Sequence, residues 1–145
     1  MGWISRSCPC STSTADRSER ALERLFYICA GIAGFFGVAL GAFAAHALKA
    51  RLAPEMLAVF ETGVRYHLYH AFALCAAAWG YARWPGRWFA IAGWSFLAGI
   101  VIFSGSLYLL VVTDQRWLGA LTPIGGVAFL AGWLMLAWGA YRAAR

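Results

Sequence analysis

Three long apolar runs without a single charged or histidine side chain dominate this sequence. The runs are Leu25–Ala45, Trp88–Val112 and Trp117–Tyr141. Each is longer than the roughly 20 residues that an α-helix needs to cross a bilayer core of about 30 Å. Hydrophobic residues make up 62% of the 145 residues, which leaves too little polar surface for a soluble domain of this size. The sequence therefore predicts an integral membrane protein.

A fourth, less apolar span is predicted between the first two of these runs. Its apolar part runs from Gly63 to Ala82 and includes Arg65, His67 and His70. The expected fold class is therefore all-α, an integral membrane four-helix bundle with spans at about 25–48, 55–82, 88–112 and 117–141. We expect residues 21–145 to form this single domain, and the polar residues 1–20 to form a disordered N-terminal tail.

The basic residues are distributed unevenly between the two sides of these spans. One side would carry Arg6, Arg17, Arg20, Arg24, Arg83, Arg87, Arg142 and Arg145. The other would carry Lys49, Arg51 and Arg116, together with Arg65 if it lies at the interface. Because basic residues accumulate on the cytoplasmic side, both termini are predicted to be cytoplasmic. The net charge of +6 then reflects contact with the lipid bilayer, and no nucleic-acid partner is expected.

The last span contains helix-breaking residues. Pro123 removes a backbone hydrogen bond, and Gly125 and Gly126 follow directly. Proline inside a helix produces a kink. We therefore expect helix four to be kinked near Pro123. The first span carries small residues at a spacing of four, including Gly37 and Gly41, which favours close helix packing within the chain over dimerisation.

Polar residues from all four spans are expected at a similar depth. Six of them fall in the outer half of the membrane when depth is counted at about 1.5 Å per residue: His46, Glu61, Arg65, His70, Ser104 and Thr122. Ionisable groups are costly in hydrocarbon, so such a cluster is a functional-site hypothesis. We predict an intramembrane polar cluster that opens outward.

The chemistry of this predicted cluster stays open. Glu61 and Arg65 are four residues apart, so they could form an ion pair that fixes the helix, or engage a lipid headgroup or small anion, or belong to an ion route. His70 could be hydrogen-bonded within the core or could titrate. No metal is expected, because three or four ligands are usually needed and the pair Cys8 and Cys10 is a weak signal.

No arrangement typical of an enzyme is visible in the sequence. There is no combination of a nucleophile with a base, no phosphate-binding loop, and no pair of carboxylates in the apolar region. We therefore expect a non-enzymatic protein without a cofactor.

Four stretches resemble a known family. They are Gly41-Ala-Phe-Ala-Ala-His-Ala-Leu48, Phe60-Glu-Thr-Gly-Val-Arg-Tyr66 with His70, Phe103-Ser-Gly-Ser-Leu-Tyr108, and Thr122-Pro-Ile-Gly-Gly126 through Phe129-Leu-Ala-Gly-Trp133. In these stretches the sequence is similar to the YgdD-like family of small membrane proteins, the domain of unknown function numbered 423, to which the eukaryotic transmembrane protein 256 is related. The resemblance runs from about Leu25 to Tyr141. It implies four membrane helices and, for a bacterial member, the inner membrane, but no reaction.

The resemblance also bears on individual residues. The six residues of the predicted cluster fall at the family's motif positions. His67 stands where the family would have Gln, and Ala44 stands where it would have Gly. His67 is therefore not expected to share a ligand role.

Three functions are compatible with these observations. The first is a polar cluster that binds a lipid headgroup, a small anion or a membrane-protein partner. The second is a small transport module for protons, ions or a solute, which could act as a homo-oligomer. The third is a structural or assembly factor in which the cluster joins the helices internally.

Overall fold

The computed structural model describes residues 14–145, and this part of the chain is helical almost throughout. In chain order its elements are α1 (Thr14–Phe43), η1 (Ala44–Leu48), α2 (Pro54–Arg83), α3 (Arg87–Gly99), η2 (Ile100–Ser104), α4 (Gly105–Thr113), η3 (Arg116–Ala120) and α5 (Thr122–Ala143). Elements η1 and η2 are π-helical turns, and η3 is a 3₁₀ turn. No strand occurs between residues 14 and 145, so the predicted all-α class is confirmed for the described residues.

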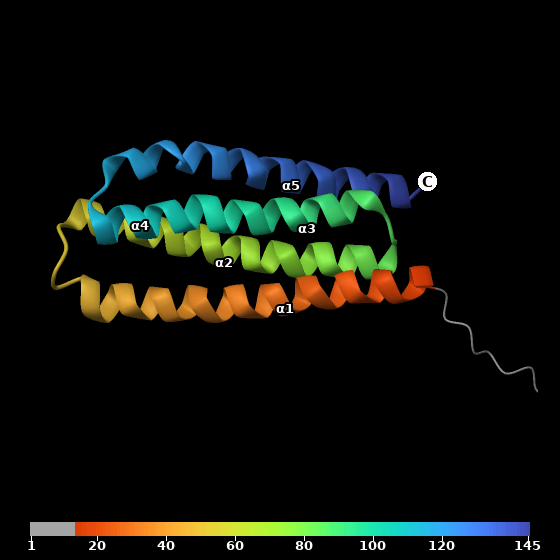
Figure 1. The fold of residues 1–145 in the computed structure, drawn as a ribbon, viewed down its shortest axis with the longest axis horizontal. Helices are drawn as coiled ribbons and strands as arrows, with labels where there is room; N and C mark the ends of the chain where they lie inside the picture. Colours follow the sequence, from red (N-terminus) through yellow and green to blue (C-terminus); the bar gives the residue numbers. More distant parts are fainter. Residues whose placement is uncertain (1–13) are drawn as a thin grey trace, which may run out of the picture.

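The elements join into four continuous helical segments that lie side by side (Figure 1). These segments are α1 with η1, α2 alone, α3 with η2 and α4, and η3 with α5. Consecutive segments run in opposite directions. As a result, α1 begins and α5 ends at the same end of the molecule, beside the turn between α2 and α3 (Figure 1).

Three of the four segments are long and apolar enough to cross a membrane. They are Arg17–Leu48, Arg87–Thr113 and Arg116–Ala143, and they match the predicted spans 25–48, 88–112 and 117–141. Large apolar side chains cover their outer surfaces, for example Phe35, Val101 and Leu130, as expected where lipid replaces water. Helix α2 is not in this group, although its bounds agree with the predicted 55–82.

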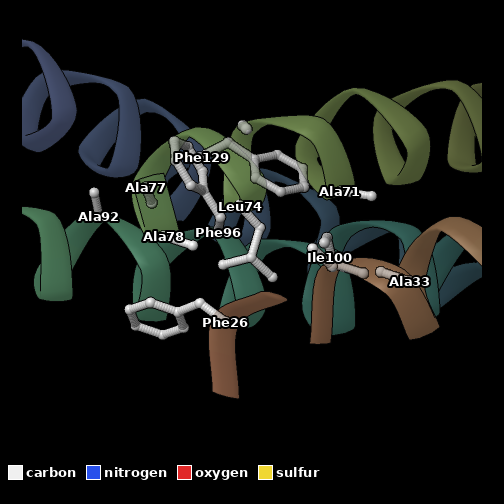
Figure 2. Close-up of a cluster of buried hydrophobic side chains, with 12 residues drawn as sticks. Phe26, Ala33, Ala71, Leu74, Ala77, Ala78, Ala92, Phe96, Ile100 and Phe129 are labelled. Atoms are coloured by element: carbon white, nitrogen blue, oxygen red, sulfur yellow. The ribbon is translucent and has the colours of Figure 1, made fainter. Parts of the chain in front are cut away.

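Helix α2 buries one face against the other segments and leaves the other face exposed, where Glu61, Arg65 and Tyr69 lie. It contacts α1, α3, η2, α4 and α5. Small side chains on its inner face let these neighbours approach closely: Ala71, Ala73, Ala77 and Ala78. Leu74 belongs to the same buried core cluster as Phe26, Phe96 and Phe129 (Figure 2).

Close packing of α1 on α2 depends on glycine. A Cβ atom added at Gly37 would lie 2.6 Å from Cδ2 of Leu68, and one added at Gly41 would lie 3.3 Å from Cγ1 of Val64. Both glycines therefore serve packing within the chain, as the spacing of four predicted.

The boundary predicted for the N-terminal tail lies too far along the chain. Helix α1 begins at Thr14, so residues 14–20, assigned to a disordered tail, are helical. Residues such as Arg17, Glu19 and Arg20 have good intrinsic helix propensity and extend the apolar helix outward. Residues 1–13, including Cys8 and Cys10, lie outside the described residues.

The kink predicted inside helix four is not observed as such. The 3₁₀ turn η3 ends at Ala120, and α5 begins at Thr122 with Pro123 in its first turn, where the missing N–H of proline costs nothing. Gly125 does not loosen the helix either. A Cβ atom there would lie 2.7 Å from Cα of Phe103, so this glycine lets α5 approach the backbone of η2.

Candidate functional site

The structure separates the predicted polar cluster into two sets. The inward-facing set is His70 and Ser104, which are buried, together with the partly buried Thr122. The outward-facing set is His46, Glu61 and Arg65, which are exposed. The six residues therefore do not meet in one cluster. On α2 the reason is the helical period, because residues 61 and 65 share one face of a helix and residues 63, 67 and 70 lie on the other.

Arg65 and Glu61 are not an ion pair. The Nε atom of Arg65 donates to the backbone oxygen of Glu61 over 3.4 Å, and no ion pair joins the two side chains in the described part of the chain. Exposed ion pairs contribute little stability, so the two exposed side chains have little to gain by pairing. The guanidinium of Arg65 therefore keeps N–H groups available for another acceptor.

His70 is held from both sides in the interior. Its Nδ1 atom lies 2.7 Å from the backbone oxygen of Tyr66, and its Nε2 atom accepts a hydrogen bond from Nε1 of Trp133 over 3.2 Å. A carbonyl can only accept and an indole can only donate, so the proton resides on Nδ1 and the imidazole is neutral. The ring also stacks on Phe129, with centroids 3.3 Å apart.

The buried hydroxyl groups connect further elements. Ser104 is completely buried in η2 and donates to the backbone oxygen of Gly63 on α2 over 2.9 Å. Ser106 on α4 donates to the backbone oxygen of Phe103 and lies 3.1 Å from Oγ1 of Thr122 on α5. Ser106 was not among the predicted site residues, although it is two positions from Ser104. The inward-facing set thus joins α2, η2, α4 and α5.

His67 is a buried residue that the sequence prediction set aside. Its Nδ1 atom lies 3.2 Å from the hydroxyl oxygen of Tyr108. Its Nε2 atom is buried and has no hydrogen-bond partner; the backbone of Ala33 on α1 lies nearby without forming a hydrogen bond of normal geometry. The sequence feature that could have revealed its burial is its position one helical turn from both Gly63 and His70, on the inner face of α2.

A groove of about 660 Å³ runs between α2 and α5. Its aromatic wall consists of Tyr66, Tyr69, Phe103, Phe129 and Trp133, with His70 beside them. The lining on the side of α5 is completed by Pro123, Gly126, Val127 and Leu130. Val127 and Leu130 are about two-thirds exposed on the apolar outer surface, so the groove opens sideways, toward the region that lipid would occupy.

A basic side chain, Arg65, lies beside this groove on α2. None of its lining residues is acidic. Arg65 lies one turn from Tyr69 on the same face of α2, because residues four apart are neighbours on a helix surface. The predicted site included Arg65 and His70 but missed Tyr69, Phe103 and Trp133, which line the groove together with His70.

Comparison with known proteins agrees with the membrane architecture. The model of a family described as a protein of unknown function, DUF423, matches residues 40–126. The UPF0382 membrane protein YwdK of Bacillus subtilis is 46% identical over 114 residues, which cover 78% of this chain and 93% of that protein. A UPF0382 membrane protein of Staphylococcus haemolyticus is 43% identical over 115 residues, which cover 78% of this chain and 92% of that protein.

The name of a further relative states its cellular location. The UPF0382 inner membrane protein YgdD of Escherichia coli is 39% identical over 123 residues, which cover 85% of this chain and 94% of that protein. No solved structure matches this chain. The names of these relatives describe membrane proteins and no enzyme, and together with the three apolar segments they confirm the predicted location, a bacterial inner membrane crossed several times. The family model and these relatives show that the chain belongs to the DUF423 family of membrane proteins.

Proposed function

We propose that all four helical segments cross the inner membrane as one bundle, with both termini in the cytoplasm. Helix α2 runs without interruption over Pro54–Arg83, and at about 1.5 Å per residue this exceeds a bilayer core of about 30 Å. Both ends of the described chain lie at one end of the molecule (Figure 1). Arg83 and Arg142 lie at the helix ends there, as the positive-inside rule expects of the cytoplasmic side.

In this membrane orientation the protein binds a membrane lipid and carries out no reaction. The headgroup is held at Arg65, and the tail lies in the groove between α2 and α5. The observation that carries this proposal is the groove itself, which has a volume of about 660 Å³ and opens sideways. Its volume lies within the range of about 300–1,000 Å³ that is usual for small-molecule sites.

Arg65 is suited to a headgroup by its place on α2. Helical side chains tilt toward the N-terminus of their helix, which for α2 is the outer end in the proposed orientation. The long side chain can therefore reach the headgroup region while its stem covers apolar surface. A guanidinium binds a phosphate group through two parallel N–H groups, and Glu61 does not occupy these donors within the described residues.

The test measures the lipid that remains bound after gentle extraction. The full-length protein is isolated in polymer-bounded nanodiscs and released into native mass spectrometry, where retained lipid is counted per protein. Arg65→Ala is expected to lose most of this lipid. Arg51→Ala is the matched control, because it removes an equally exposed positive charge at the same end of the molecule. Equal retention by the wild type and Arg65→Ala would contradict the headgroup assignment.

A second candidate is a structural or assembly factor. It is favoured by one observation: His70, Ser104 and Thr122 all direct their polar atoms to other groups of the chain. If this candidate is correct, the Arg65→Ala variant complements a deletion strain completely when it is produced at the wild-type protein level. If the protein acts by binding lipid, the same variant is expected not to complement the deletion strain.

Transport has no comparable support. Both ring nitrogens of His70 are engaged. Further along the inner face of α2 follow Leu74 and Ala77, so within the described residues no polar path continues from His70 toward the other end.

A further inference from the structure

The groove has a wall of aromatic rings, some of which stack on one another. Tyr66 and Phe103 stack with centroids 4.6 Å apart and planes 29° from parallel. His70 and Phe129 stack with planes 8° from parallel. Tyr66 connects the two stacks, because its plane is 20° from that of His70 and 28° from that of Phe129, whereas the planes of Phe103 and Phe129 are 52° apart. All four rings line the groove. His70 and Phe129 are almost fully buried, so the ring surfaces that a ligand can reach belong mainly to Tyr66, Tyr69 and Trp133, which are 42%, 59% and 47% exposed.

Such a wall distinguishes between two kinds of lipid tail. A saturated acyl chain rotates about every carbon–carbon bond and loses this freedom when it is confined. A prenyl chain has a rigid double bond and a methyl branch in every isoprene unit, so it has fewer rotations to lose. Its flat unsaturated units also make broad dispersion contacts with ring faces. The aromatic wall therefore favours a prenyl tail.

The mouth of the groove favours a head with a single phosphate. Arg65 supplies one guanidinium, which matches one phosphate group. The carboxylate of Glu61, one helical turn further out, disfavours heads that carry several negative charges. No acidic side chain lines the groove below.

We propose that the groove binds a polyprenyl phosphate, with the phosphate on Arg65 and the first isoprene units between α2 and α5. This rests on the proposed lipid-binding function and names its ligand. The lining extends along α5 from Pro123 to Trp133, about 15 Å at 1.5 Å per residue. The rest of a longer chain leaves through the open side at Val127 and Leu130 into the bilayer.

The experiment compares two amphiphiles with the same head and the same main-chain length. Farnesyl phosphate has a prenyl tail, and dodecyl phosphate has a saturated one. Each is titrated into the full-length protein in phosphatidylcholine nanodiscs, and the dissociation constant is measured by native mass spectrometry. Farnesyl phosphate is expected to bind about tenfold more tightly, which corresponds to about 1.4 kcal/mol.

Variants of the aromatic wall test the cause of this preference. Tyr69 lines the groove, is 59% exposed and forms no hydrogen bond through its side chain in the described structure, so its replacement is compatible with folding. Tyr69→Leu is expected to reduce the preference for farnesyl phosphate at least threefold, and Tyr69→Phe to preserve it. Phe72→Leu is the control, because Phe72 is an exposed aromatic residue of α2 outside the groove.

The outcomes separate this inference from the function on which it rests. If both amphiphiles bind equally and Arg65→Ala weakens both, the protein binds phosphate lipids and the prenyl assignment is wrong. If neither binds, or if Arg65→Ala changes nothing, the proposed function fails and the prenyl assignment fails with it. A preference that is unchanged in Tyr69→Leu would overturn the role assigned to the aromatic wall.

Discussion

Replacing Trp133 by phenylalanine tests the hydrogen bond that joins α5 to α2 at the groove. Nε1 of Trp133 donates to Nε2 of His70 over 3.2 Å, while Nδ1 of the same imidazole is engaged by the backbone oxygen of Tyr66. Trp133→Phe keeps an aromatic ring and removes the donor. The Nε2 lone pair is then left without a partner in a side chain that is 5% exposed.

The expected cost follows from this geometry. An unsatisfied buried acceptor costs about 1–3 kcal/mol. Two features place the expected cost of Trp133→Phe at the lower end of this range. The distance of 3.2 Å is at the long end of the normal range, and measured side-chain hydrogen bonds in a membrane protein average about 0.6 kcal/mol, with a maximum of about 1.7. We expect Trp133→Phe to lower the free energy of unfolding by about 1–1.5 kcal/mol.

A double-mutant cycle isolates the hydrogen bond from the lost ring volume. His70→Phe removes the acceptor but keeps a flat ring against Phe129. Unfolding in mixed micelles with increasing SDS is followed by circular dichroism for the wild type, both single variants and Trp133→Phe/His70→Phe. The double variant should be less destabilised than the sum of the singles by about 0.6–1.5 kcal/mol. A coupling below about 0.3 kcal/mol, the scatter of independent sites, would refute the assignment of Nε2 as the acceptor.

Three further predictions follow from the packing, the exposed charges and the proposed orientation. Gly125→Ala forces a Cβ atom against the backbone of η2 and should cost about 1–3 kcal/mol in the same unfolding assay, whereas Gly31→Ala, with nothing within 4 Å of the added atom, should cost nothing. Glu61→Gln should change stability by less than about 0.5 kcal/mol, because the carboxylate is exposed and forms no ion pair among the described residues; a larger loss would reveal an interaction absent from this structure. In intact cells without the native cysteines, an impermeant maleimide should label Ala50→Cys and not Ala144→Cys, and labelling of both would contradict the proposed orientation.

The fold class could be predicted from the sequence because crossing a membrane requires long apolar runs, which composition alone reveals. The run Leu25–Ala45 lies within α1 and η1, and Trp88–Val112 lies within the α3 to α4 segment. The wrong predictions concerned helix ends, namely the start of α1 and the position of Pro123, because the residues beside a helix end determine where the helix begins or stops. Proline was taken as an interruption of a helix at Pro123, but the 3₁₀ turn η3 places it in the first turn of α5, which proline favours.

The groove could not be predicted, because it depends on how the helices are rotated about their own axes. Tyr69, Phe103 and Trp133 belong to three different elements, and each looks like an ordinary lipid-facing aromatic residue in the sequence. Their convergence requires the close approach of α5 to η2 at Gly125 and the wider π-helical turn of η2 itself. Neither feature is visible in residue spacing.

The rotation of α2 also explains why the predicted cluster combined two sets of residues that the structure keeps apart. Residues three and four apart share a helix face, so Gly63, His67 and His70 form an inner stripe that is buried among the other segments. Arg65 and Tyr69 form an outer stripe on the opposite face. Depth along the helix is the same for both stripes, which is why depth alone suggested one site. The inner stripe packs against the other segments, and in the proposed orientation the outer stripe leads from the membrane surface to the groove, so the proposed ligand binding and the stability of the fold should respond to different substitutions on the same helix.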